Sequence, residues 1–566
     1  MTTPDERRSR LLENYKEWHP KTLGAWLDET ASRWGERPFV ITDDVTWTYG
    51  DVARLSKVLA DGLVAVGVKP GDRVGMLMAN FPEFVPFKFA IARAGGLAIP
   101  FNFLYGAKEL GYVLDQSECS VLLTMTGFSG LDYLEMLDSI QPGWEEGVEE
   151  SAEEGLRQVI TLSTDGRHRD GALTYEALYE LGLENAGASD GIAVAPDDIG
   201  DMLFTSGSTG SPKGVTVTHD AVLRTGYASA VTRAYEDERR ILFSLPCYHM
   251  FGYVEGILSA MFVGGAVVLL TKFSAENYLA GIEKHRATDI LCVPTMAVAM
   301  VESPKRNDYD ISSLNAILCG SAPAPIWLWE KVEELFGVSE IVTGYGMTEC
   351  GGAMTLTLPE DPLILTSTTA GRPKMAGAAG VPGTGDICVY STIDPVTEEA
   401  LPIGETGELV SHGPTTMIGY WNKPEETSAA LSPEGILRSG DLGVVRPDGY
   451  IQVTGRSKEL YKSGGELVMP KEIEDLVASL DAVSQAFAIG ISDDRWGEIG
   501  CLVVVRSPGA NIDEEEILSY CKENLARFKV PKRVVFTDSD RLPTTPTGKI
   551  QKFRLNELVA TPAAQA

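Results

Sequence analysis

Thr205-Ser-Gly-Ser-Thr-Gly-Ser-Pro-Lys-Gly214 is the segment of this sequence that says most about its fold. Its glycines let backbone amides approach phosphate oxygens closely, its hydroxyls add donors, and Lys213 adds a positive charge. A Walker loop ends in Gly-Lys-Ser/Thr, whereas here Pro212 stands before the lysine. The segment therefore indicates a nucleotide-binding architecture of another kind, with a flexible Ser/Gly surface loop as the alternative.

Four further motifs follow in order: Gly344-Tyr-Gly-Met-Thr-Glu349, Ser439-Gly-Asp441, Gly455-Arg456 and Pro543-Thr-Thr-Pro-Thr-Gly-Lys549. Together with residues 205–214 they resemble the successive core motifs of the adenylate-forming superfamily. That superfamily includes acyl-CoA synthetases, adenylation domains of peptide synthetases and firefly luciferase. The resemblance covers residues 23–554, and it is strongest to acyl-CoA synthetases of fatty or other hydrophobic acids.

The composition is that of a globular enzyme. A chain of 566 residues with 44% hydrophobic and 23% charged residues predicts two or more cores. A formal charge of −32 argues against nucleic-acid partners and anionic membranes. The longest uncharged run, residues 256–271, is shorter than a membrane span needs, and the N-terminal residues lack an apolar signal core. The eight cysteines occur singly, as reduced thiols do, so we expect a cytoplasmic enzyme with no integral membrane association.

The first half of the chain alternates between helical and strand patterns. Apolar residues at helical spacing over 55–66 precede a strand at 74–78, and a helix at 84–94 precedes a strand at 97–101. This alternation predicts an α/β fold with a largely parallel sheet covered on both faces. Residues 381–421 are rich in Gly, Pro and short β-type runs, which predicts a small β subdomain.

A separate compact domain is expected beyond residue 455. The pattern there gives a helix at 472–480, strands at 486–491 and 501–505, a helix at 513–524 and a strand at 533–536. The predicted fold class is therefore α/β. Residues 1–455 form a large N-terminal domain of doubly wound α/β subdomains plus a small β-barrel-like subdomain. Residues 456–458 form a hinge, and residues 459–566 form a small mobile α+β C-terminal domain.

The resemblance implies a nucleotide site built from several motifs. The glycine-rich loop would hold the β- and γ-phosphates of ATP, although Lys213 is alternatively a charged rim residue. Tyr345 offers a flat face for adenine, Thr348 a hydroxyl for the α-phosphate, and Glu349 a carboxylate for Mg²⁺. Asp441 would accept hydrogen bonds from both ribose hydroxyls. The expected nucleotide-binding residues are Thr205, Ser206, Gly207, Ser208, Thr209, Gly210, Lys213, Gly320, Ser321, Ala322, Pro323, Gly344, Tyr345, Gly346, Met347, Asp441 and Arg456.

The resemblance also implies catalytic lysines in the C-terminal domain. Lys549 follows a rigid, turn-forming segment that contains Pro543, Pro546 and Gly548. In the family the matching lysine bridges the carboxylate and the α-phosphate. By the same resemblance Lys458 is the hinge residue, Lys462 serves the second half-reaction, and Gly465 lines a thiol tunnel; Lys462 is alternatively an ordinary surface charge. The expected catalytic residues are Lys549, Thr348, Glu349, His249 and Lys462.

A histidine marks the expected acid pocket. His249, in Pro246-Cys-Tyr-His-Met-Phe-Gly252, matches the family position beside the carboxylate, with a core histidine as the alternative. The stretch 246–256 has no other basic residue, and glycines follow Cys350, so we expect a roomy apolar pocket for a medium or bulky hydrophobic acid rather than acetate. The expected wall consists of His249, Tyr253, Gly256, Thr295, Cys319 and Gly351.

The sequence thus predicts an AMP-forming acyl-CoA synthetase that uses ATP, Mg²⁺ and coenzyme A. Transfer of the acyl group to a carrier protein or to a separate partner ligase is the close alternative. Luciferase-type oxygenation shares every adenylation motif and ranks lower. An inactive nucleotide-binding regulator also ranks lower, because Glu349, Asp441, Arg456 and Lys549 are all present. A monomer and a homodimer both remain open.

Overall fold

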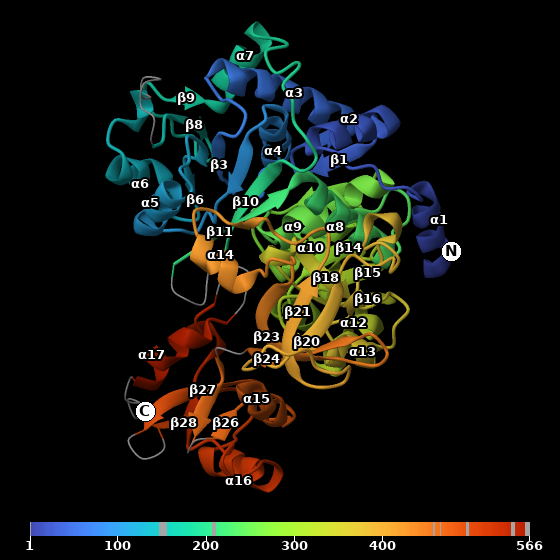
Figure 1. Ribbon diagram of the computed structural model, residues 1–566, viewed down its shortest axis with the longest axis vertical. Coiled ribbons are helices and arrows are strands. Elements are labelled where there is room, and N and C mark those ends of the chain that lie inside the picture. Colours follow the sequence, from blue (N-terminus) through green and yellow to red (C-terminus); the bar gives the residue numbers. More distant parts are fainter. Residues whose placement is uncertain are drawn as a thin grey trace. The chain divides into compact units, whose positions relative to one another are not determined.

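The computed structural model describes residues 2–146, 155–205, 211–456, 459–463, 466–493, 497–544 and 550–560. The chain divides into two compact units. The first consists of Met1–Val389 and Ser411–Leu437, and the second of Tyr390–Val410 and Arg438–Ala566. The second unit thus contains part of the expected β subdomain together with the C-terminal residues (Figure 1). The hinge expected at residues 456–458 stays a prediction.

An eight-stranded sheet in the first unit carries the glycine-rich segment. Its order is β22-β11-β10-β4-β3-β5-β8-β9, parallel from β10 to β9 and antiparallel at β11 and β22. The strands are β3 (Arg73–Leu77), β4 (Leu97–Pro100), β5 (Val121–Met125), β8 (Gln158–Leu162), β9 (Leu173–Thr174), β10 (Ile199–Thr205), β11 (Lys213–Thr218) and β22 (Gly419–Tyr420).

A seven-stranded sheet in the same unit precedes several other predicted site segments, which follow its strands in the chain. Its order is β16-β15-β14-β12-β13-β1-β2, and every neighbouring pair except β1 and β2 is parallel. The strands are β1 (Pro38–Ile41), β2 (Thr46–Thr48), β12 (Arg240–Phe243), β13 (Ala266–Leu269), β14 (Asp289–Cys292), β15 (Ala316–Cys319) and β16 (Glu340–Val342). Both sheets confirm the predicted α/β class.

Local sequence signals explain the first predicted helix. α3 (Tyr49–Ala65) starts at Thr48, whose side chain accepts a hydrogen bond from the Asp51 amide, while the Asp51 carboxylate accepts one from the Thr48 amide. This reciprocal capping box satisfies two of the amides that a helix start leaves without partners. β3, α4 (Phe84–Arg93) and β4 then follow as the alternating pattern predicts.

The remaining helices of the first unit connect or cover these sheets. They are α1 (Pro4–Asn14), α2 (Leu23–Trp34), α5 (Ala107–Gln116), α6 (Tyr133–Ile140), α7 (Tyr175–Glu184), α8 (His219–Thr232), α9 (Met250–Gly252), α10 (Ala275–His285), α11 (Pro294–Glu302), α12 (Ile326–Phe336), α13 (Leu363–Thr368) and α14 (Pro424–Ala430). No helix in the described part of the chain is both long enough and apolar enough to cross a bilayer.

The second unit contains two sheets. One has the order β20-β21-β23-β24, and the other has the order β26-β25-β28-β27 with β29 beside β28. Their strands are β20 (Val389–Ile393), β21 (Gly407–His412), β23 (Leu437–Val445), β24 (Ile451–Arg456), β25 (Tyr461–Ser463), β26 (Glu466–Val468), β27 (Val483–Asp493), β28 (Gly497–Arg506) and β29 (Arg533–Phe536). Its helices are α15 (Pro470–Ala478), α16 (Glu514–Asn524) and α17 (Leu555–Ala560).

The C-terminal elements lie where the sequence pattern predicts them, but the β subdomain differs in extent. Its sheet also uses β23 and β24, which lie beyond the predicted 381–421. Gly419–Tyr420, inside that range, instead forms β22 and pairs with β11 in the first unit. Short β runs alone do not reveal which sheet a strand joins, because the partner is distant in sequence.

Candidate active site

Four predicted site segments follow neighbouring parallel strands of the seven-stranded sheet. His249 comes after β12, Thr295 after β14, Gly320 after β15 and Gly344 after β16. These strands are paired side by side in parallel, so their carboxyl ends lie at one edge of the sheet. In open α/β sheets that edge is where ligands bind. The fold therefore collects at one edge four segments that the sequence spreads over about a hundred residues.

The motif at residues 344–349 forms a tight hairpin. β17 (Gly344–Met347) leads through the turn Thr348–Cys350 into β18 (Gly352–Leu356), and β19 (Arg372–Pro373) completes this small sheet. A Cβ on Gly346 would lie 2.0 Å from the Gly352 carbonyl oxygen, and one on Gly344 would lie 2.3 Å from that of Thr355. Only glycine fits where the backbones approach this closely. The turn holds Thr348 and Glu349, each 8% exposed.

The expected adenine segment presents small residues to solvent. Ser321, Ala322 and Pro323 are exposed directly after β15, whereas Gly320 is buried. Ser321 has a φ of +72°, a left-handed conformation that residues other than glycine adopt rarely. Such conformations cluster at ligand sites, where the surrounding structure holds them in place. This geometry is consistent with backbone contact to a flat ring.

The ends of the glycine-rich loop are fixed by a hairpin. Thr205 at the end of β10 pairs with Lys213 at the start of β11. Five predicted phosphate-binding residues lie between them and outside the described residues: Ser206, Gly207, Ser208, Thr209 and Gly210. Lys213 Nζ lies 4.8 Å from the centroid of the Tyr420 ring, within cation–π range.

Tyr420 connects Lys213, at the end of the glycine-rich loop, to the hairpin that carries Glu349. Its hydroxyl donates a hydrogen bond to Glu349 Oε1 at 2.9 Å, while its ring faces Lys213. Burial, with the Glu349 carboxylate adding to it, raises the pKa of Tyr420 well above its ordinary value, so the hydroxyl stays protonated and can donate. The sequence interpretation missed this residue. Its segment was assigned to the β subdomain, and nothing in the residue pattern showed that β22 pairs with β11.

Replacing Tyr420 with phenylalanine keeps the ring over Lys213 and removes only the hydrogen bond to Glu349. Hydrogen bonds to charged groups contribute more than neutral ones, so we expect KM for ATP with Mg²⁺ to rise about 10-fold, with a smaller fall in kcat. The measurement is ATP–pyrophosphate exchange at varied ATP. Tyr49→Phe, which removes a hydroxyl bonded to the Gly265 carbonyl in the same unit, is the control and should leave KM unchanged. An unchanged KM for ATP in Tyr420→Phe would contradict a role of the Tyr420–Glu349 hydrogen bond in binding ATP with Mg²⁺.

Two of the predicted acid-pocket residues, His249 and Tyr253, lie at the start of a rare helical turn. His249 precedes α9, and its Nδ1 accepts a hydrogen bond from the Phe251 amide at 3.2 Å, so the neutral ring carries its proton on Nε2. Tyr253 begins the π-helix η2 (Tyr253–Leu258), and its hydroxyl donates to Asp201 Oδ2 at 3.2 Å. π-Helical turns occur frequently at functional sites.

Three other wall residues differ in their surroundings. Thr295 is exposed at the start of α11, whereas Cys319 is fully buried in β15, in register with Cys292. Burial raises the pKa of the Cys319 thiol well above its ordinary value, which makes it a poor nucleophile. Gly256 packs against β12, since a Cβ there would lie 2.6 Å from the Phe243 ring. Their roles in an acid pocket stay predictions.

The second unit brings Asp441 and Arg456 together. They face each other across β23 and β24, with Arg456 Nε 2.9 Å from Asp441 Oδ1. Ser439 orients this turn, because its hydroxyl donates to the Leu409 carbonyl and accepts from the Asp441 amide. Asp441 is buried. A carboxylate fixed beside a guanidinium can recognise neighbouring hydroxyls such as those of ribose.

The structure does not describe the side chains of the residues predicted to act from the C-terminal part. Lys458, Gly465 and Lys549 lie outside the described residues, and of Lys462, in β25, the structure describes the backbone alone. Within the described ranges no group of three or more His, Cys, Asp or Glu side chains could hold a metal ion. Glu349 offers one hard carboxylate, which suits Mg²⁺ whose other ligands are phosphate oxygens and water.

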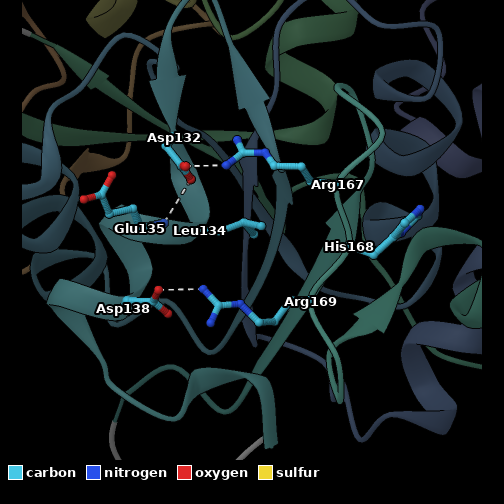
Figure 2. A pocket seen from close by; sticks show the side chains of 7 residues that line it. All are labelled: Asp132, Leu134, Glu135, Asp138, Arg167, His168 and Arg169. Atoms are coloured by element: carbon cyan, nitrogen blue, oxygen red, sulfur yellow. Dashed lines mark hydrogen bonds and ion pairs between the residues drawn. The ribbon is translucent and has the colours of Figure 1, made fainter.

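A cavity of about 420 Å³ lies elsewhere, beside α6 (Figure 2). Arg167 forms ion pairs with Asp132 and Asp165, and Arg169 forms one with Asp138. Because carboxylates already neutralise both arginines, this cavity offers no free positive charge to a phosphate or a carboxylic acid. Among the residues that the structure describes, none predicted to bind the nucleotide lines it.

Comparisons with known proteins show the family of this chain. The family model described as AMP-binding enzyme matches residues 27–421, and that of the AMP-binding enzyme C-terminal domain matches residues 472–549. The feruloyl-CoA synthase of an Amycolatopsis species is 34% identical, covering 94% of this chain and 97% of the relative. The solved structure of ATP-bound MatB from Rhodopseudomonas palustris is 27% identical with a TM-score of 0.80, covering 94% of this chain and 98% of that one.

A further relative is the 3-[(3aS,4S,7aS)-7a-methyl-1,5-dioxo-octahydro-1H-inden-4-yl]propanoyl:CoA ligase of Mycobacterium tuberculosis. It is 32% identical, covering 95% of this chain and 99% of the relative. The chain therefore belongs to the family of AMP-binding enzymes, and its class is that of the AMP-forming acid:CoA ligases.

Proposed function

We propose that this enzyme activates a medium-sized or bulky hydrophobic carboxylic acid and transfers its acyl group to coenzyme A. The observation that carries the proposal is the link from Lys213 through Tyr420 to Glu349. It joins the end of the glycine-rich loop to the hairpin that follows β16, at the sheet edge where the segments after β12, β14, β15 and β16 lie. The relatives named as CoA ligases of a feruloyl and a bicyclic propanoyl acid support a bulky substrate.

In the first half-reaction a carboxylate oxygen attacks the α-phosphorus of ATP. The bond from that phosphorus to the bridging oxygen breaks, so acyl-AMP forms and pyrophosphate leaves with the bond electrons. Lys213 and the loop hydroxyls hold the β- and γ-phosphates, and Thr348 donates to the α-phosphate. Mg²⁺ at Glu349 would neutralise phosphate charge. Lys549 supplies positive charge where the carboxylate and the α-phosphate react.

In the second half-reaction the sulfur of coenzyme A attacks the acyl carbon. The thiol loses its proton, the carbon–oxygen bond to phosphate breaks, and AMP leaves. We assign Lys462 and Gly465 to this step and Lys458 to a hinge that separates the two steps. Such a motion gates the chemistry and does not itself accelerate it.

The acceptor and the acid can be tested together. Purified enzyme is incubated with ATP, Mg²⁺ and a panel of acetate, octanoate, 3-phenylpropanoate and a polycyclic propanoate, with coenzyme A or a carrier protein as acceptor. Mass spectrometry of the products should show CoA thioesters of the larger acids and little acetyl-CoA. Equal turnover of acetate and the larger acids would contradict the predicted pocket. Acylation of the carrier protein alone would identify that protein, and not coenzyme A, as the acyl acceptor.

A further inference from the structure

A buried ion pair between Glu255 and Lys374 has no part in the chemistry proposed above. Lys374 Nζ lies 3.0 Å from Glu255 Oε1, and neither side chain is more than 1% exposed. Lys374 also donates to the Ser229 hydroxyl at 2.7 Å and to the Thr225 carbonyl at 3.3 Å. Burial lowers the pKa of Lys374, and the Glu255 carboxylate opposes this shift. Hydrophobic residues of similar volume often stabilise a fold as well as a buried pair does, so its presence calls for another reason.

One partner of the pair lies in the same helical turn as two expected wall residues of the acid pocket. Glu255 belongs to the π-helix η2, which also contributes two of the predicted wall residues. Thr225, whose carbonyl accepts a hydrogen bond from Lys374, packs against two glycines of the β17–β18 hairpin. A Cβ on Gly351 would lie 3.3 Å from Thr225 Oγ1, and one on Gly352 would lie 3.5 Å from Thr225 Cγ2. The ion pair therefore connects η2 to the helix that packs against the two glycines after Cys350.

One oxygen of this pair has no donor. Glu255 Oε2 is buried and has no hydrogen-bond partner among the residues that the structure describes. Lys374 directs its three donor interactions to Glu255 Oε1, Ser229 and Thr225. A buried acceptor without a donor costs free energy, and a ligand that supplies the donor recovers it. A site of this kind rejects an analogue that lacks the donor.

We propose that Glu255, held in place by Lys374, selects acids that carry a hydroxyl at the end remote from the carboxylate. The hydroxyl donates to Glu255 Oε2. This inference rests on the proposed function, because it uses the same acid pocket, and it narrows the substrate to a hydrophobic acid with a distal hydroxyl.

The test compares size-matched acids by ATP–pyrophosphate exchange. The probes are 3-(4-hydroxyphenyl)propanoate, 3-(4-fluorophenyl)propanoate and 3-phenylpropanoate, with 8-hydroxyoctanoate and octanoate as a flexible pair. We expect the wild-type enzyme to prefer the hydroxylated member of at least one set by about 10-fold or more in kcat/KM. Glu255→Gln should reduce that preference to about 2-fold or less. It should leave kcat/KM for the matched acid without a hydroxyl within about 3-fold.

Two further variants separate recognition from folding. The double variant Glu255→Gln with Lys374→Met leaves no unpaired buried charge, and it should lose the hydroxyl preference as well. Asp289→Asn breaks another fully buried pairing, with Arg233 and Arg239, and should keep the preference. Exchange with the plain acids but no hydroxyl preference in the wild type overturns this inference alone, as does a preference that survives in both Glu255 variants. No exchange with any acid overturns the proposed function itself.

Discussion

Lys549→Ala is expected to lower acid-dependent pyrophosphate release by about 1000-fold, because it removes the charge that we assign to the α-phosphate during acyl transfer to AMP. The same variant should still form a CoA thioester from supplied acyl-AMP at a rate within about 3-fold of the wild type. The two half-reactions should respond differently because we assign Lys549 to the first step and Lys462 to the second. Pyrophosphate release and thioester formation are measured separately, by exchange and by mass spectrometry.

The control is Lys532→Ala, which removes an exposed lysine from the same unit. It should leave both half-reactions unchanged. Wild-type pyrophosphate release in Lys549→Ala would end the assignment of that lysine. Equal loss of both half-reactions would also count against it, since that result indicates damage to the fold rather than removal of one charge.

Glu349→Gln is expected to lower kcat for adenylation by about 100-fold and to raise the Mg²⁺ concentration needed for half-maximal rate by about 10-fold. Glutamine keeps an oxygen that accepts from Tyr420 but loses the charge that Mg²⁺ prefers. The fall in kcat should exceed the fall in kcat of Tyr420→Phe, because that variant leaves the Glu349 carboxylate in place. The measurement is exchange at varied Mg²⁺ and saturating ATP. An unchanged Mg²⁺ dependence would remove Glu349 as the ligand.

Local patterns were enough to predict the fold class and most elements. The capping box at Thr48 and Asp51, the strand–helix alternation from β3 to β4, and the order of elements from α15 to β29 all depend on residues close in sequence. Such signals are strong because each is satisfied within a turn or two of the chain.

Pairings between distant segments could not be predicted in the same way. Tyr420 meets Glu349 only because β22 joins β11, and Glu255 meets Lys374 across 119 residues. Neither pair has a local pattern, so a single sequence does not distinguish them from ordinary core or surface residues. The motif residues themselves were found from the sequence by resemblance, whereas the contacts that hold them in place required the structure.

Exchange of labelled pyrophosphate into ATP, measured without coenzyme A, tests whether this enzyme forms an acyl-adenylate. With Mg²⁺ and a panel of fatty, aromatic and polycyclic acids, we predict exchange that depends on the added acid and is weak with acetate. Absence of exchange with every acid of a broad panel would contradict acid adenylation and favour a nucleotide-binding protein without catalysis.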